Sequence, residues 1–227
     1  SYNLNDAQLE ELLKPTIDEI HAVLGGDYAK SILFLKGMFL DDECGDNLEN
    51  DFVKALMIDP KMMNDPHVRN RIHFMIKKRI NDAKIGKIKV NSNFSIISGD
   101  PYSLCQSMFG LEVTGLLKSG EAYNKYWVDK KADKVVCFRA PMTCHNNIRI
   151  LKMVRNEDID YWYEYMTTCT ILNSWDTTTH ALNGADKDSD QILITDNSIL
   201  LNNTKQLPAI MCIQRKANKK IIDEESL

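Results

Sequence analysis

The sequence lacks any paired cysteine motif and any long apolar segment. Its cysteines are scattered without a Cys-x-x-Cys pair, so a zinc site is not expected and reduced thiols are the better interpretation. No apolar run approaches the roughly 18 to 20 residues that span a bilayer, and the first residues show no signal-peptide pattern. These absences favour a cytoplasmic protein that has no membrane partner.

The sequence also has no excess of positive charge, with 28 lysine and arginine residues against 32 acidic ones. The formal net charge is -4 at pH 7, which gives no general sign of a nucleic-acid-binding protein. Basic residues nevertheless cluster between residues 69 and 89, where apolar residues first keep helical spacing. An ordinary surface helix explains this pattern. Contact with a phosphate backbone, with Lys77, Lys78 and Arg79 as the candidate residues, is the alternative.

The rest of the composition is that of an ordinary globular chain, with 44% apolar and 26% charged residues among 227. Capping residues and helical spacing predict helices early in the chain, and short β-like runs between turns follow. The predicted helices are residues 5–24, 28–40 and 69–80. An acidic, glycine-containing connection at 41–51 leads into a further helix. The candidate strands are residues 87–90, 94–97, 113–117, 135–139, 147–151, 165–172 and 191–195.

Helices followed by short strands predict an α+β fold, whose β region forms a barrel or a strongly bent sheet. We expect a helical region at residues 1–86, the barrel domain at 87–203, and a C-terminal tail or the start of a following segment at 204–227. The chain starts at Ser1 without methionine, which is compatible with a domain of a longer protein.

Three acidic residues stand at alternating positions just before the last candidate strand: Asp186, Asp188 and Asp190. If their side chains converge, their mutual repulsion is unfavourable unless a cation lies among them. A hard divalent ion such as Mg²⁺ prefers oxygen ligands of this kind. A solvated acidic turn is the other interpretation. A calcium loop of the EF-hand type does not fit, because it needs glycine and glutamate where this chain has Gln191 and Asn197.

Three groups of residues, in this order, resemble the double-psi β-barrel RNA polymerases. The first comprises residues 88–90, 97–100 and 115–121, and is similar to the start of the catalytic barrel in the cellular RNA-dependent RNA polymerases of gene silencing and in single-chain phage polymerases. The second, residues 138–149 (FRAPMTCHNNIR), also resembles the Arg-Ala-Pro…His segment of the β′ subunit of multisubunit RNA polymerase. The third is the acidic stretch, similar to the family's Gly-x-Asp-x-Asp-Gly-Asp signature.

The sequence departs from the family pattern at three positions around the acidic triplet. Lys187 stands where the family has an apolar residue, and Ser189 stands where it has glycine. Since glycine eases a tight turn, serine requires a permissive backbone or a different loop. Asn183 is out of register with the asparagine of the multisubunit enzymes, so the resemblance does not imply the sugar contact of that asparagine here.

The resemblance implies a double-psi barrel whose three aspartates are catalytic and bind Mg²⁺, with Mn²⁺ as the alternative ion. It further implies that Arg139 senses the nucleotide sugar and that Pro141 shapes the backbone beside it. His145 and Arg149 complete the implied substrate-binding set. From the residues alone, Arg139 suits a strand-end salt bridge, His145 suits a structural role, and Arg149 suits either a phosphate or an internal carboxylate. His180 precedes the triplet without a defined role.

The implied activity is nucleotidyl transfer from a nucleoside triphosphate to an RNA 3′ end, on a DNA or an RNA template. A working polymerase of this kind has a second barrel, in another domain or subunit, for which we find no room after residue 87. We therefore expect a fragment or subunit that is inactive in isolation. The alternative is an inactive polymerase-like protein that binds nucleic acid, in which Lys187 partly neutralises the acidic cluster. Nucleophilic catalysis by Cys144 and His145 is disfavoured, since neighbours on a strand point in opposite directions.

Overall fold

The computed structural model describes residues 3–40 and 51–209, and divides the chain into two compact units. The helical unit comprises residues 4–90, and the barrel unit begins at residue 91. Whether these units are the separate domains expected from the sequence stays a prediction. Several predicted features lie outside the described residues. They are the acidic connection expected at residues 41–51, apart from its last residue, most of the expected C-terminal tail, and two of the cysteines, Cys44 and Cys212.

The helical unit contains four α-helices and one 3₁₀ helix within its described residues. They are α1 (Asp6–Leu24), α2 (Tyr28–Leu40), α3 (Asp51–Ile58), η1 (Pro60–Asn64) and α4 (Pro66–Lys84). Asn5 caps α1 by accepting from the backbone of Gln8, whose side chain bonds back to the Asn5 N–H. Asp65 caps α4 in front of a proline, a favoured helix start. The predicted helices are confirmed where the structure describes them.

The core of the helical unit is formed by side chains from α1, α2, α3 and α4. Leu35 and Leu56 are completely buried, and Val53 and Ile76 pack with them. On the surface Glu19 of α1 joins the unit's two ends. It accepts from Lys89 Nζ at 2.7 Å, and its second oxygen lies 3.4 Å from the Nε of Arg79 in α4.

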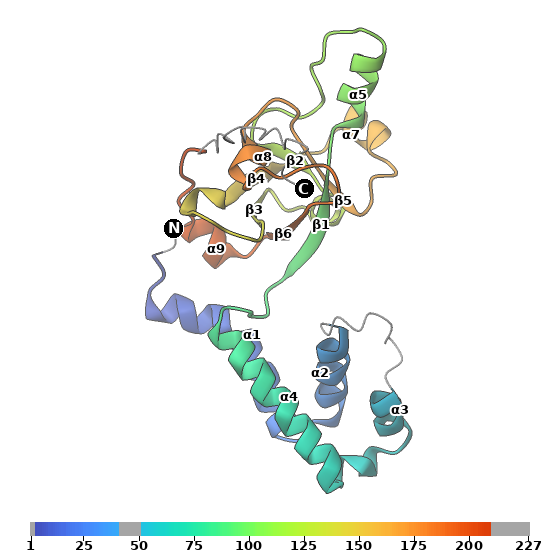
Figure 1. Ribbon diagram of the computed structural model, residues 1–227, viewed down its shortest axis with the longest axis vertical. Helices are drawn as coiled ribbons and strands as arrows, with labels where there is room; N and C mark the ends of the chain where they lie inside the picture. The colour runs from blue at the N-terminus through green and yellow to red at the C-terminus, as the bar shows by residue number, and fades with distance from the viewer. Residues whose placement is uncertain (1–2, 41–50, 210–227) are drawn as a thin grey trace, which may run out of the picture. The chain divides into compact units, whose positions relative to one another are not determined.

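The barrel unit contains a closed six-stranded barrel. Its strands are β1 (Ser92–Ser98), β2 (Glu121–Tyr123), β3 (Lys134–Phe138), β4 (Arg149–Met153), β5 (Cys169–Leu172) and β6 (Gln191–Thr195). They are hydrogen-bonded in the order β1-β5-β2-β4-β3-β6. The β1/β5 and β2/β4 pairs are parallel and the others antiparallel, so the chain crosses the barrel between non-neighbouring strands (Figure 1). The expectation of an α+β fold with a barrel is confirmed.

Short helices connect the strands. They are α5 (Pro101–Met108), α6 (Lys125–Asp129), η2 (His145–Asn147), α7 (Glu157–Trp162), α8 (Thr178–Ala181) and α9 (Ser198–Asn203). Figure 1 shows α5 and α7 near one end of β1, where Tyr102 and Trp162 meet edge to face with ring centroids 5.0 Å apart. Val135, Ile171 and Ile194 fill the barrel interior. This interior is a packed apolar core, which gives the connecting loops a rigid support.

Two predicted strands, residues 87–90 and 113–117, are wrong. In the first, the Lys87 N–H bonds to the Asp82 carbonyl and the Lys89 N–H bonds to the Thr16 hydroxyl. In the second, the N–H groups of residues 114 and 115 both donate to the side-chain oxygen of Gln106. These segments are apolar enough for strands, but side chains and turns occupy their backbone donors, so they cannot join a ladder.

The sequence also concealed several elements. One is α5: Asp100 followed by proline is a helix start, and Asp100 accepts from the Tyr102 N–H to cap this helix. Strand β2 has three residues and gave no periodic signal. Strands β3, β4 and β6 lie where expected within two residues, whereas β5 occupies only the second half of its predicted range. In residues 3–40 and 51–209 no helix is long and apolar enough to cross a bilayer.

Candidate functional site

Some residues from each of the three groups that carry the resemblance meet at one place, although they are far apart in sequence. We call residues 183–190, between α8 and β6, the acidic loop. Its last residue, Asp190, receives a hydrogen bond on its carbonyl from the Ile97 N–H of β1 at 2.8 Å. Its carboxylate receives another from Arg139, just after β3, at 2.7 Å. Lys187 in the middle of the loop covers Gly99, just after β1. Residues 97 and 99 of the first group and Arg139 of the second therefore contact the acidic loop, which is the third group.

Arg139 fastens both ends of the acidic loop. Its Nη1 donates to the carbonyl oxygens of Leu182 at 3.3 Å and Asn183 at 3.2 Å, and its Nη2 donates to Asp190 Oδ2. The side chain is 16% exposed and that of Asp190 is 23% exposed, so this ion pair is largely shielded from water. The hydrogen bond from Arg139, followed by that from the Asp186 N–H, holds the pKa of Asp190 below its usual value. Arg139 thus forms the salt bridge that its position suggested; its role toward a nucleotide stays a prediction.

The backbone of the acidic loop turns sharply at both ends. Asn183 and Gly184 have φ angles of 60° and 64°, and Ser189 has a φ of 94°. Asn183 is a residue type that tolerates such angles, whereas serine is not favoured there. The turn closes when the Asp186 N–H donates to Asp190 Oδ2 at 2.7 Å. Ser189, which stands where the family signature has glycine, therefore adopts a positive φ in this chain.

The three aspartates offer the oxygen donors that a hard cation needs, but they are not drawn together. Asp186 and Asp188 are exposed, and Asp190 is half-buried. Within the described residues, no three acidic, histidine or cysteine side chains are close enough to form a metal-binding group. Asp190 Oδ1 has no protein partner in the described part of the chain, and the Arg139 bond fixes its orientation. The donor chemistry therefore fits Mg²⁺, while Asp186 and Asp188 would have to approach Asp190.

Pro141 and Asn183 connect the second segment to the acidic loop. The Ala140–Pro141 peptide bond is cis, and the Pro141 carbonyl accepts from Asn183 Nδ2 at 3.3 Å. Thr143 Oγ1 donates to Asn183 Oδ1 at 3.1 Å. These bonds link the second segment to Asn183 of the acidic loop, and the expected role of Pro141, shaping the backbone beside Arg139, stays a prediction.

His145, Arg149 and His180 do not join the aspartates in this structure. His145 lies exposed in η2, and His180 is exposed at the end of α8. Arg149 is buried, and donates to the carbonyl oxygens of Leu207 at 2.9 Å and Asn146 at 2.6 Å. Burial lowers the pKa of Arg149. Its guanidinium therefore holds backbone rather than a carboxylate in the described residues, and a phosphate-binding role stays a prediction.

The sequence did not single out Asn147, which organises the same region. This buried residue accepts from the N–H groups of Thr143 and Cys144, both at 2.9 Å, and donates to the Ala181 carbonyl at 2.7 Å. It thereby joins the second segment to α8, directly before the acidic loop. The available signal in the sequence was an asparagine two residues after His145 of the motif. Its partner Ala181 is 34 residues away in the chain, so the sequence does not show the contact.

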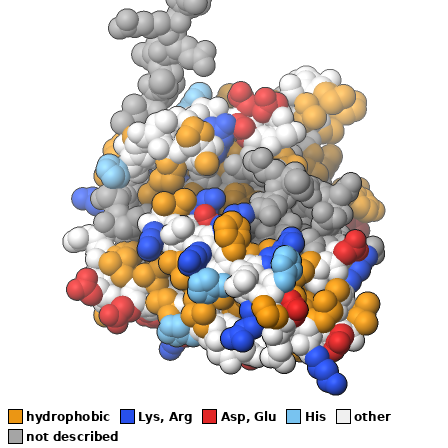
Figure 2. Space-filling view, turned by 60° about the horizontal axis from the view of Figure 1, so that its bottom comes forward, with side chains coloured by type: hydrophobic (Ala, Val, Ile, Leu, Met, Phe, Trp, Pro, Cys, Tyr) orange, Lys and Arg blue, Asp and Glu red, His pale blue; other side chains and the backbone are white. Residues whose placement is uncertain are grey.

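The residues predicted to contact nucleic acid lie on α4 and differ in their exposure to solvent. Lys77 and Lys78 are exposed, whereas Arg79 is half-buried and engaged by Glu19. In the face drawn in Figure 2, lysine and arginine side chains stand among exposed hydrophobic ones, without a single continuous basic patch. Arg79 is therefore best explained as a structural residue of the helical unit. Nucleic-acid binding by Lys77 and Lys78 stays a prediction.

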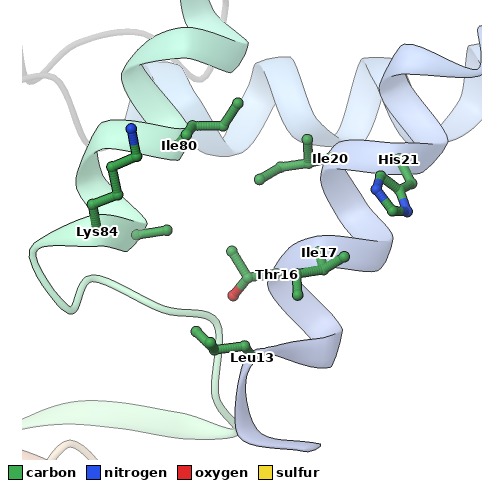
Figure 3. Close-up of a pocket in the computed structure, with 8 residues that line it drawn as sticks. Leu13, Thr16, Ile17, Ile20, His21, Ile80 and Lys84 are labelled. Atoms are coloured by element: carbon green, nitrogen blue, oxygen red, sulfur yellow. The ribbon is translucent and has the colours of Figure 1, made fainter. Parts of the chain in front are cut away.

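A separate hollow of ≈ 330 Å³ lies within the helical unit, between α1 and α4. Figure 3 shows Thr16 and Ile20 of α1 directed toward Ile80 of α4, and the ring of His21 directed away from them. Its lining is mainly aliphatic and contains no carboxylate. It therefore offers no group for nucleotidyl transfer, and the acidic loop remains the candidate site.

The closed six-stranded barrel, with an acidic loop held by Arg139, fits the fold expected of the double-psi β-barrel RNA polymerases. A sequence match to an RNA polymerase confirms the resemblance. The chain is similar to the DNA-directed RNA polymerase YonO of Bacillus phage SPbeta, with 26% identity over 208 residues. The match covers 90% of this chain, which spans 23% of the length of that relative.

No protein-family model matches the chain. Among solved structures, it is similar to the RNA dependent RNA polymerase QDE-1 from Thielavia terrestris, with a TM-score of 0.45 and 10% identity. That likeness covers 67% of this chain and 16% of the other, and is too distant to add to the sequence match. The relationship to RNA polymerases therefore depends on the phage relative and on the barrel.

Proposed function

We propose that this chain is the metal-binding catalytic part of an RNA polymerase, which transfers a nucleotide from a nucleoside triphosphate to an RNA 3′ end. The observation that carries the proposal is the convergence of Arg139 and Asp190, from two separate motif segments, at the end of one acidic loop. The similarity to a phage polymerase along 90% of the chain supports it. Because the chain spans 23% of that relative, the second barrel is proposed to lie in another domain or subunit.

Asp186, Asp188 and Asp190 would hold the divalent cation. Mg²⁺ fits their hard oxygen donors, and Mn²⁺ is the alternative. When bound, the cation supplies stabilisation of the negative charge that develops at the reacting phosphate. Asp190 is oriented by Arg139 before any ligand arrives, whereas the side chains of Asp186 and Asp188 are exposed and would approach it when the cation binds. This chain's own contribution is therefore to position the reacting groups.

In this proposal Arg139 also positions the sugar of the incoming nucleotide. Its Nη1 and Nη2 already bond to the acidic loop, so its guanidinium also sets where the edge of that loop lies. An incoming ribose placed against Arg139 would be positioned relative to Asp190 by the same side chain. This coupling supports a sugar-sensing role that does not require Arg139 to leave its carboxylate.

The proposed metal site is tested by titrating the chain with Mg²⁺ and Mn²⁺ in a calorimeter. We expect saturable binding to the wild type, and loss of binding in Asp188→Asn, which removes one charge without changing side-chain size. Asp133→Asn, at an exposed aspartate in another loop of the barrel unit, is the matched control. Equal heats for all three proteins would contradict the metal site.

The proposed activity is tested in the full-length parent protein by primer extension on DNA and on RNA templates. We expect Asp190→Asn to abolish extension on whichever template supports it. Continued synthesis by this variant would reject the catalytic assignment. A parent that binds nucleic acid but extends no primer would favour the alternative function, an inactive polymerase-like binding protein. Lys187 gives that alternative no support, since in the described residues its ammonium is paired with none of the three aspartates.

A further inference from the structure

A pocket of ≈ 520 Å³ adjoins the acidic loop at the junction of β1 and α5. Gly99 and Asp100 line it where the chain leaves the barrel, and Leu104 and Met166 contribute apolar surface. Lys187 reaches it from the acidic loop. The volume is that of a small-molecule site, and the lining combines one cation with an apolar wall.

Lys187 faces this pocket rather than the neighbouring aspartates. Its Cδ, Cε and Nζ lie 3.3, 3.4 and 3.0 Å from the position that a Cβ on Gly99 would occupy. The absence of a side chain on Gly99 therefore makes room for the lysine. In the described part of the chain the Lys187 ammonium forms no ion pair, so its charge is available to a ligand.

The acidic residue of the lining does not cancel this charge. Asp100 is 3% exposed, and its carboxylate is directed into the protein. Its Oδ1 accepts from the Tyr102 N–H, and its Oδ2 accepts from Ser103 Oγ and the Leu116 N–H, all at 2.9 Å. Because three donors already stabilise the carboxylate, the charge presented to the pocket is that of Lys187.

We propose that this pocket binds a nucleoside phosphate, with the phosphate at Lys187 and the nucleoside against Leu104 and Met166. A nucleotide has an anionic phosphate and a flat base with apolar faces, which match the cation and the apolar side chains of the lining. The choice of ligand class rests on the proposed polymerase function. The lysine itself does not come from the resemblance, which would place an apolar residue at this position. The ligand is either a free nucleoside triphosphate or one nucleotide of a bound strand.

The test is a binding titration of the whole chain in EDTA, without divalent cations. ATP, inorganic tripolyphosphate and a short single-stranded oligonucleotide are added separately, and the amide resonances of Gly99 and Lys187 are followed by NMR. We expect ATP or the oligonucleotide to shift both resonances. Lys187→Met keeps the aliphatic part over Gly99 and removes the charge, so affinity should fall about tenfold, as for loss of one charge-assisted hydrogen bond. Lys187→Arg should retain binding, and Lys134→Met, at an exposed lysine of the same unit, is the matched control.

A second variant tests the apolar side. Leu104, which is 62% exposed, is replaced by serine; Leu104→Ser should weaken ATP binding and leave tripolyphosphate binding unchanged. Tighter binding of ATP assigns the pocket to the free triphosphate, and tighter binding of the oligonucleotide assigns it to the strand. Undiminished ATP and oligonucleotide affinity in Lys187→Met, or shifts confined to other residues, would overturn the proposal.

The test is independent of the proposed catalytic function. Asp188→Asn, which is expected to lose Mg²⁺ binding, should still bind ATP in EDTA because Lys187 is unchanged. A wild-type chain that binds ATP at Lys187 but shows no saturable Mg²⁺ binding would therefore reject the proposed metal site alone. Retained Mg²⁺ binding with no nucleotide effect at Lys187 would reject only this pocket.

Discussion

Arg139 and Asp190 are 51 positions apart in the sequence, yet their side chains are 2.7 Å apart and form an ion pair that fixes the end of the acidic loop. The pair joins the segment after β3 to the residue before β6, two antiparallel neighbours in the barrel. Its geometry therefore depends on the closed barrel rather than on local sequence. This relationship leads to the first prediction.

Arg139→Gln should raise the pKa of Asp190 toward the usual aspartate value of about 3.9, because the strongest cause of its lowered pKa is removed. A carboxylate whose folded pKa is lowered stabilises the protein above its unfolded pKa, and this contribution is lost as the pH falls through the folded value. The stability difference between wild type and variant should therefore be largest near neutral pH and shrink in acid. NMR titration of Asp190 and urea unfolding at several pH values measure both effects.

The control for that prediction is Arg155→Gln. Arg155 is half-exposed and pairs with Asp160 and Asp129, away from the acidic loop. It should leave the Asp190 titration unchanged. A normal Asp190 pKa in the wild type, or an unchanged one in Arg139→Gln, would show that the ion pair does not govern this carboxylate.

Ser189→Gly should leave the free energy of unfolding unchanged or raise it by up to about 1 kcal/mol. Glycine removes the cost of a positive φ for an L-residue, partly offset by greater freedom of the unfolded chain. The same substitution at Ser107, exposed within α5, should lower the free energy of unfolding by about 0.5 kcal/mol. Chemical denaturation of both variants measures the contrast, and equal destabilisation would mean that the φ of Ser189 stores no strain.

Gln106→Leu should destabilise the barrel unit by about 2 kcal/mol, since it leaves two partly buried backbone donors without a partner. Gln106 Oε1 accepts from the N–H groups of Thr114 and Gly115, at 3.1 and 3.0 Å. Gln191→Leu, at an exposed position in β6, should change stability by no more than about 0.5 kcal/mol. Urea unfolding of the two leucine variants separates lost hydrogen bonds from the general effect of adding leucine; matching values would remove Gln106 from the account of this loop.

Replacing Lys77 and Lys78 together by glutamine should weaken binding to duplex nucleic acid and reduce the salt dependence of log Kobs by up to about 2, if both contact phosphates. Arg79→Gln should instead lower stability, because Arg79 pairs with Glu19 in the helical unit. Fluorescence anisotropy from low to moderate salt measures the binding, and thermal unfolding measures the second effect. An unaltered salt slope in the double variant would exclude α4 as a phosphate contact.

Much of the fold was predictable because its signals are local. The cap at Asn5 and the β-branched run of β6 identify their elements within a few neighbouring residues. The error at residues 113–117 has the opposite cause, since Gln106 occupies the donors of that segment and no local pattern records this. Likewise, β2 is too short to show a period.

The candidate site was predictable in composition but not in arrangement. The resemblance indicated the acidic triplet and Arg139, and the structure brings Arg139 to Asp190. The resemblance could not indicate that Lys187 covers Gly99, because that contact depends on how the acidic loop lies against β1. The position of Asn147 is a similar case, since its bond to Ala181 follows from the barrel's crossovers.

The pairing of β1 with β6 also limits when the site can exist. Ser92 at the start of the first strand is opposite Thr195 at the end of the last, so the barrel closes only after the whole intervening chain is in place. Such distant pairings form slowly, because their loop-closure entropy must be overcome before the contacts are gained. The Asp190 carbonyl is bonded to β1 in this same seam. We therefore expect that a nascent or truncated chain lacking β6 would have the aspartates but not the arrangement of the loop, which forms only when the barrel closes.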